Sequence, residues 1–173
     1  MTERIHYALG QSSLGDFIAA ASDRGLVAFE FGESRTGLVQ GLQARFADFL
    51  VEEDALGLSD VVARLTVVAD HPDRDPGLAL DLRGSEFQKR VWELLRRIPA
   101  GQTTTYGAIA AKMGTPRDAR DVTEAIAANT IAILIPCHRV VRKDGSMSGY
   151  RWGFRRKRSL LAREAKAAPF LLR

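Results

Sequence analysis

The chain has 173 residues, of which 46% are hydrophobic and 27% are charged, a composition typical of an ordinary globular protein with one or two small domains. Its single cysteine excludes an internal disulfide, and no apolar run approaches the roughly 20 residues of a membrane-spanning helix. The first residues lack the apolar segment of a signal peptide, so we expect a cytoplasmic protein without a membrane partner.

Charge is divided unevenly along the chain. Residues 1–81 contain 6 Lys and Arg against 14 Asp and Glu, a balance of −8, whereas residues 82–173 contain 19 basic and 7 acidic residues, a balance of +12. A polar, proline-containing segment at 71–77 lies close to this change of sign, so we expect two domains, 1–80 and 81–173. Basic residues can simply solubilise a surface, but an excess of this size favours a nucleic-acid partner for the second domain.

The first domain shows short strand and helix patterns. Residues 5–32 predict strands and turns, and the clearest strand covers 26–31, where residues that favour β-structure follow an Asp-Arg-Gly turn. Apolar residues recur every fourth position over 37–51 and predict a helix, and a weaker helix is expected over 58–68. Both strands and helices are therefore expected in the first domain.

The second domain begins with stronger helix signals. Ser85 and Gln88 form a capping box ahead of an apolar helical stripe that ends at residues 99–101. A second helix is predicted over 105–113, and a third runs to residue 128, with Thr115 as its cap and Pro116 at its first position. Two short helices separated by a turn are typical of a helix-turn-helix, which in the basic half favours DNA.

The only cysteine, Cys137, follows an apolar, β-branched run at 131–135 that predicts a buried strand or extended segment. A histidine beside a thiol can serve as the base for nucleophilic chemistry at sulfur. A lone cysteine is also commonly an inert buried thiol, so the residues alone leave both interpretations open. The three histidines and this cysteine have no metal-ligand spacing, so we expect neither a metal nor a cofactor.

The last segment is rich in arginine and lysine. A turn is predicted at 144–145, and a basic cluster at 151–158 precedes a terminal helix that includes Glu164. Within the cluster, residues 155–158 are either a solvated face or a contact for phosphate groups.

The segment Ile-Pro-Cys-His-Arg-Val at 135–140 resembles the active-site motif of the O6-alkylguanine-DNA alkyltransferases, also named methylated-DNA–protein-cysteine methyltransferases. The similarity is strong over 83–166 and weaker before it, and residues 147–153 most resemble the methyltransferase half of Ada-type bacterial members. This resemblance implies an α/β protein: a small N-terminal, ribonuclease H-like α/β domain, then a mainly helical, winged-helix-like domain with a helix-turn-helix that binds DNA and transfers the alkyl group.

The resemblance also implies an activity: irreversible, single-turnover transfer of an alkyl group from O6 of guanine in double-stranded DNA to the cysteine sulfur, with O4-alkylthymine as a further candidate substrate. It implies a monomer that extrudes the damaged nucleotide. The catalytic positions would be Cys137 as nucleophile, His138 as its base through a water, Glu164 as the orienting carboxylate, Tyr106 as proton donor to guanine N3, and Asn129 as a hinge.

Further positions are implied for DNA and the base. DNA contacts would come from Arg120, which fills the vacated stack, and from Tyr106, Ala119, Thr123 and Arg139. The guanine pocket would be lined by Val140, Met147, Tyr150, Arg151 and Trp152. Read without the resemblance, Tyr106 fits a core aromatic, Asn129 a helix C-cap, His138 a core histidine and Glu164 a solvated charge.

The chain departs from the family pattern on its recognition helix. Asp121 and Glu124 place carboxylates near a surface intended for phosphates, although i,i+4 pairs with Arg117 and Arg120 could neutralise them. We therefore expect weaker DNA affinity, and a lesion-binding or regulatory module without efficient repair is the alternative function. Ser148 also replaces a common glycine.

Overall fold

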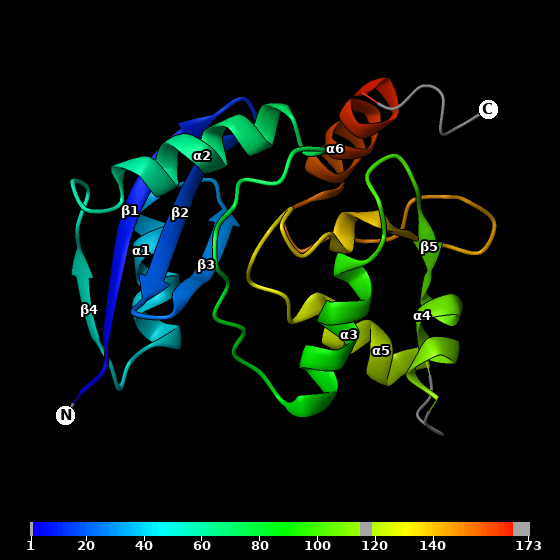
Figure 1. The fold of residues 1–173 in the computed structure, drawn as a ribbon, viewed down its shortest axis with the longest axis horizontal. Helices are drawn as coiled ribbons and strands as arrows, with labels where there is room; N and C mark the ends of the chain where they lie inside the picture. Colours follow the sequence, from blue (N-terminus) through cyan, green and yellow to red (C-terminus); the bar gives the residue numbers. More distant parts are fainter. Residues whose placement is uncertain (1, 115–118, 168–173) are drawn as a thin grey trace. The chain divides into compact units, whose positions relative to one another are not determined.

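The computed structural model describes residues 2–114 and 119–167. It separates into two compact units, Met1–Asp70 with Arg74–Leu82, and His71–Asp73 with Arg83–Arg173 (Figure 1). Strands dominate the first unit and helices the second, so the chain is a mixed α/β protein. No helix in the described ranges has both the length and the apolar character needed to cross a bilayer.

The first unit is built around a four-stranded sheet. Its elements are, in chain order, β1 (Arg4–Ser12), β2 (Gly15–Ser22), β3 (Gly25–Phe31), α1 (Arg35–Arg45), β4 (Leu50–Glu53) and α2 (Ser59–Asp70). The strand order is β3-β2-β1-β4, with antiparallel pairing among the first three strands and parallel pairing of β4 with β1.

Both faces of this sheet are covered. Alternate residues of the strands point to opposite faces. One face packs Ile5 and Ile18 against Leu42 of α1, and the other carries the aromatic contact of Phe17 with Phe29, whose rings meet edge-on with centroids 5.2 Å apart. Burial on both sides explains why β2 and β3 read as nearly continuous apolar runs.

The structure confirms strands and turns over 5–32 and the helix predicted at 58–68, but it corrects the helix predicted at 37–51. α1 ends at Arg45, and Leu50–Glu53 forms β4 against the edge of β1. The spacing of apolar residues cannot reveal β4, because its partner strand β1 lies more than forty residues earlier in the chain. Pairing with β4 also satisfies backbone hydrogen-bonding groups at the edge of β1, which would stay unpaired if α1 continued.

The second unit consists mainly of helices. Its elements are α3 (Glu86–Arg96), β5 (Thr104–Thr105), α4 (Tyr106–Met113), α5 (Ala119–Ala127), the short 3₁₀ helix η1 (Cys137–Arg139), β6 (Val140–Val141) and α6 (Phe154–Ala167). Strands β5 and β6 pair in parallel. The buried Trp92 indole donates to the Ala125 carbonyl at 2.8 Å, which fixes α3 against α5.

The predicted starts of α3 and α4 and the predicted end of α4 agree with the structure, whereas α3 ends at Arg96, before the predicted end at residues 99–101. Ser85 and Gln88 form the expected capping box of α3. Thr105 caps α4, and Gly114 ends it in the left-handed conformation, with φ of 63°. The predicted cap at Thr115 and the proline after it lie outside the described residues.

The apolar run at 131–135 is not a strand. It folds into successive buried turns, in which the Ile135 amide donates to the Ile131 carbonyl at 3.3 Å and Ile133 has a φ of 67°. β-branched residues are favoured in strands partly because they pack well when buried, and here they are buried in turns that follow a single bridge residue at Ile131. Because α6 begins at Phe154, the basic residues 155–158 also belong to the helix instead of preceding it.

Candidate active site

Cys137 lies at the first position of η1, just after the buried turns, and is only 5% exposed. Asn129 holds this segment at both ends. Its Nδ2 donates to the Ile135 carbonyl at 2.9 Å and to Cys137 Sγ at 3.3 Å, while its Oδ1 accepts from the Ile131 amide at 2.9 Å. The single amide group therefore fixes the loop and points a donor at the sulfur.

The Cys137 thiol is protonated at neutral pH. Burial raises its pKa to about 11, because a thiolate in an apolar environment loses its hydration. The Asn129 hydrogen bond and the nearby charges of Lys157 and Arg151 act in the opposite direction without offsetting burial. Reaction at this sulfur therefore requires a base.

His138 and Glu164 form a fully buried pair, with His138 Nε2 2.5 Å from Glu164 Oε1. Burial lowers the pKa of His138, so its imidazole is neutral at physiological pH. Burial alone would raise the pKa of Glu164, but hydrogen bonds and charges from His138 and Arg139 together lower it, which leaves a carboxylate.

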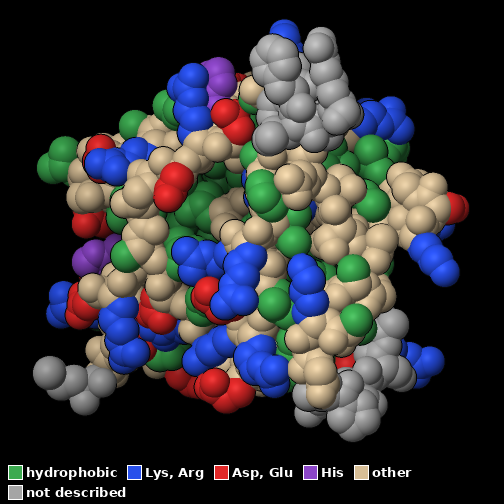
Figure 2. Space-filling view, turned by 45° about the vertical axis from the view of Figure 1, so that its right-hand side comes forward, with side chains coloured by type: hydrophobic (Ala, Val, Ile, Leu, Met, Phe, Trp, Pro, Cys, Tyr) green, Lys and Arg blue, Asp and Glu red, His purple; other side chains and the backbone are tan. Residues whose placement is uncertain are grey.

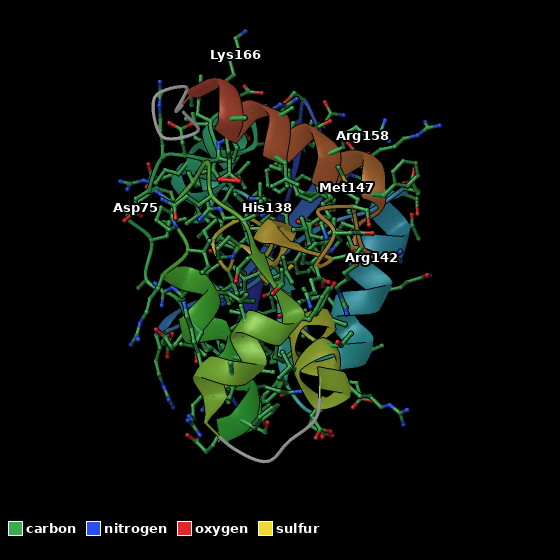
Figure 3. The ribbon with its side chains drawn as sticks, turned by 90° about the vertical axis from the view of Figure 1, so that its right-hand side faces the viewer. Asp75, His138, Arg142, Met147, Arg158 and Lys166 are labelled. Atoms are coloured by element: carbon green, nitrogen blue, oxygen red, sulfur yellow. The ribbon has the colours of Figure 1, made fainter. Side chains whose placement is uncertain are left out.

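These protonation states fix the histidine tautomer. A carboxylate can only accept, so His138 donates through Nε2–H and its Nδ1 carries the free lone pair. That Nδ1 atom is buried and has no hydrogen-bond partner in the part of the chain that the structure describes. A basic nitrogen without a protein partner is therefore available one residue from the thiol. Figure 3 shows His138 in the interior, beneath α6.

Arg139 takes a different place from the DNA contact that we expected. It is 7% exposed, and its guanidinium binds Glu164 Oε2 through Nε at 2.8 Å and Nη2 at 2.5 Å. It also donates to the carbonyl of Ile98 at 2.5 Å. The structure therefore assigns Arg139 to neutralising the buried carboxylate, since an arginine fork matches carboxylate geometry.

The residues expected around the guanine base differ in their exposure. Val140 and Trp152 are buried, Met147 and Tyr150 are half-buried, and the Tyr150 ring meets Trp152 edge-on at 5.2 Å. Arg151 is exposed, with its guanidinium 5.9 Å from the Trp152 ring centre.

A hydrogen bond joins the side chains of Tyr106 and Ser148. The Tyr106 hydroxyl donates to Ser148 Oγ at 2.7 Å, so the start of α4 is tied to the segment after β6.

Lys157 is a residue that the sequence interpretation missed. Although it belongs to a cluster of four basic residues, it is 0% exposed, and its Nζ lies 2.6 Å from the Val140 carbonyl and 2.8 Å from Ser148 Oγ. The available signal was spacing, because Lys157, Leu160 and Glu164 share one buried face of α6.

On α5, Arg120 and Thr123 are exposed, as expected for a surface that meets DNA. The expected pair of Arg120 with Glu124 is not among the ion pairs of the described residues, whereas Arg117 and the side chain of Ala119 lie outside what the structure describes. Figure 2 shows Lys and Arg side chains mixed with acidic ones on the visible face.

Glu164→Gln is expected to destabilise the second unit by about 3–5 kcal/mol, because it leaves the Arg139 guanidinium buried without its counter-charge. Urea unfolding monitored by Trp fluorescence measures the change. Because the pKa of Glu164 is lowered in the folded protein, its contribution to the free energy of unfolding is complete at pH values above the usual carboxyl pKa and is lost as the pH falls through the lowered pKa. The Glu164→Gln variant should therefore lack this dependence of stability on acid pH. Glu86→Gln, at a side chain 91% exposed, is the matched control and should unfold like the parent.

Alkylation of Cys137 by iodoacetamide should be slower than that of free cysteine at every pH tested and should keep rising tenfold per pH unit past pH ~8.5, where free cysteine levels off. The reason is that the buried thiol has its pKa at about 11. Mass spectrometry of the alkylated protein gives the rates, and a plateau near the free-cysteine pKa would contradict the burial argument.

Comparison with known proteins agrees with this geometry. Residues 86–166 match the model of the 6-O-methylguanine DNA methyltransferase DNA-binding domain. The chain is 42% identical over 169 residues to the bifunctional transcriptional activator/DNA repair enzyme Ada of Escherichia coli, covering 94% of this chain and 46% of that protein. It is 51% identical over 92 residues to the methylated-DNA–protein-cysteine methyltransferase of Mycolicibacterium paratuberculosis, covering 53% and 56%. The chain thus spans about half the length of these curated relatives.

Solved structures extend the match to the whole fold. A crystal structure of Mycobacterium tuberculosis OGT in complex with DNA superposes with a TM-score of 0.75 at 36% identity, covering 96% of this chain and 97% of that one. A structure of the same organism's O6-methylguanine methyltransferase gives a TM-score of 0.74 at 33% identity, with 96% of both chains covered. The chain belongs to the 6-O-methylguanine-DNA methyltransferase family.

Proposed function

We propose that this chain repairs DNA by direct reversal, moving an alkyl group, methyl in the simplest case, from O6 of guanine in duplex DNA to Sγ of Cys137. The observation that carries the proposal is a buried thiol, held by Asn129, next in sequence to a neutral imidazole that is itself oriented by the buried Glu164 carboxylate. The names of the relatives, methylated-DNA–protein-cysteine methyltransferase and DNA repair enzyme Ada, support the same reaction.

The first step is removal of the thiol proton. His138 Nδ1 has the free lone pair, and among the described contacts of Cys137 Sγ the side-chain partner is Asn129, so the proton passes to Nδ1 through a bridging water. The S–H bond breaks and an N–H bond forms, while Glu164 stabilises the imidazolium that results. The Asn129 amide donates to the developing thiolate.

The second step is transfer of the alkyl carbon. The thiolate attacks the carbon, an S–C bond forms, the C–O6 bond breaks and its electron pair stays on the guanine. Tyr106 gives a proton to guanine N3, which neutralises the leaving base. The product is a thioether that water does not cleave, so each molecule acts once and no cofactor is consumed.

The reacting carbon lies inside the duplex, so the nucleotide must first be extruded. Arg120 is exposed on α5, from which it can fill the vacated stack, and Thr123 is exposed on the same helix, where a small side chain favours a close approach to the minor groove. Residues Thr105 to Ala108 at the start of α4 line a pocket together with Arg142 and Lys143, where a helix N-terminus and two cations favour a DNA phosphate.

The proposal includes the finer fold. A strand order of β3-β2-β1-β4 with only β4 parallel supports a ribonuclease H-like first domain, 1–80. The packing of α3, α4 and α5 beside the small β5–β6 sheet supports a winged-helix-like second domain, 81–173, with α4 and α5 as its helix-turn-helix. In this proposal, both DNA binding and alkyl transfer belong to the second domain.

Intact mass spectrometry after incubation with duplex DNA containing one O6-methylguanine tests the reaction. The protein should gain the mass of one methylene group, mapped by peptide digestion to Cys137, with complete reaction at one lesion per molecule. Cys137→Ala, which removes only the sulfur atom, should gain nothing. Tight binding to lesion DNA without a mass change would favour the alternative, a lesion-binding module.

Arg120→Ala should slow methyl transfer from duplex DNA by at least about tenfold, the equivalent of 1.4 kcal/mol, because the extruded state loses the side chain that fills the stack. Transfer from free O6-benzylguanine, which needs no extrusion, should keep its parental rate. Single-turnover rates on both substrates provide the comparison, with Arg96→Ala on an exposed face of α3 as the control. Equal slowing on both would remove Arg120 from the extrusion step.

A further inference from the structure

Three polar groups form a continuous chain behind the guanine pocket. Lys157 Nζ donates to Ser148 Oγ at 2.8 Å, and the Tyr106 hydroxyl donates to the same oxygen at 2.7 Å. Lys157 and Ser148 are 0% and 8% exposed, so the chain runs from the interior of the second unit to the half-buried Tyr106.

Burial of the Lys157 ammonium group carries a cost in desolvation free energy. Its other Nζ partners are the carbonyls of Val140 at 2.6 Å, Ser148 at 3.4 Å and Gly149 at 3.4 Å, and all of them are neutral. No carboxylate forms an ion pair with it among the described residues. A methionine would fill the same space without the desolvation cost, so packing alone does not account for a lysine here.

Ser148 is the group through which a proton can pass. Its hydroxyl accepts from Lys157 and from Tyr106, and it donates weakly to the Val140 carbonyl at 3.3 Å. A hydroxyl that has both lone pairs and a rotatable proton can reverse its direction once a neighbour becomes an anion. The glycine common at this position would interrupt the chain.

We propose that Lys157 and Ser148 return to Tyr106 the proton that Tyr106 gives to the leaving guanine. This inference rests on the proposed function. As the C–O6 bond breaks, the Tyr106 O–H proton moves to guanine N3; the Ser148 hydroxyl proton moves to the tyrosinate, and a Lys157 ammonium proton replaces it. Lys157 ends as a neutral amine, which regains a proton from solvent after the product leaves.

The electrostatic surroundings suit a lysine that gives up its proton. Burial lowers the pKa of Lys157 to about 8, with Cys137 as a thiolate acting to raise it and Arg142 to lower it. The His138 imidazolium formed in the first step is a further positive charge that opposes the ammonium. Once Cys137 has become a neutral thioether, its support for the ammonium is gone, so proton release is easier after transfer than before it.

Lys157 also ties β6 to the segment at 148–149, so a slow variant alone would not separate proton supply from structural support. The substrate can separate them. In 3-deaza-O6-methylguanine a C–H replaces N3, which removes the acceptor of the Tyr106 proton. A defect in proton supply affects only the normal base, whereas a misplaced pocket wall affects both.

The experiment measures single-turnover methyl transfer to Cys137 from duplexes with either base, at saturating DNA. Parental protein should prefer O6-methylguanine over its 3-deaza analogue, and Tyr106→Phe should remove that preference. Ser148→Ala and Ser148→Gly should slow the normal base by at least about tenfold and the analogue by less than about threefold, whereas Ser148→Thr, which keeps the hydroxyl, should behave like the parent.

Lys157→Arg adds a second, independent readout. Arginine keeps the charge and the hydrogen bonds but does not release a proton near neutral pH. Lys157→Arg should therefore lower the preference for the normal base, and Lys157→Met, which has no proton to give, should lower it as well. Arg158→Met removes the exposed cation next along α6 and should leave both rates unchanged.

Equal slowing of both substrates by Ser148→Ala and Ser148→Gly, or no slowing of either, would overturn the relay while leaving methyl transfer intact. If the parental protein transfers no methyl group from either duplex, the proposed function fails instead. The two failures are therefore distinguishable.

Discussion

The second unit depends on the contacts that the buried carboxylate of Glu164 makes with His138 and Arg139. Contributed by α6, this carboxylate binds Arg139 and His138 of η1, and Arg139 in turn reaches the carbonyl that follows α3. A carboxylate that is 1% exposed is tolerable only with such partners, so the same contacts that close the core also set the charge and the tautomer of the imidazole. Stability and chemistry at this site therefore have a common origin.

Asn129 has the corresponding role on the other side of the sulfur. It donates to the Ile135 carbonyl and to Cys137 Sγ and accepts from the Ile131 amide, and it lies two residues after the end of α5, the helix proposed to enter the minor groove. Movement of α5 on binding DNA would thus reach the thiol through one side chain. The proposed nucleophile, its proposed base and the helix proposed to meet DNA all belong to the second unit of the chain.

Local signals predicted much of the fold, and contacts between distant residues account for what they missed. Ser85 and Thr105 cap their helices as expected, because a helix cap depends only on residues within four positions of one another in the sequence. Two predictions were wrong: residues 50–53 form the strand β4 instead of extending a helix, and residues 131–135 form turns instead of a strand. The parallel pairing of β4 and the buried turns at 131–135 depend on contacts that the spacing of apolar residues does not encode. At the site, the motif located Cys137, but Arg139 and Lys157 carry the same charges as surface residues. For Lys157 the helical spacing with Leu160 and Glu164 was an available signal, whereas the burial of Arg139 follows only from its partners in the fold. The cytoplasmic location and the monomeric state stay predictions.

The protonated, enclosed state of Cys137 also bears on how long the protein stays usable. Peroxide and oxidised glutathione react with exposed thiolates, and this sulfur is neither exposed nor ionised at rest. In the proposed function each molecule reacts once, so a molecule oxidised at Cys137 could no longer repair DNA. Burial and protonation of the sulfur before a lesion is bound would therefore preserve active molecules under oxidising conditions.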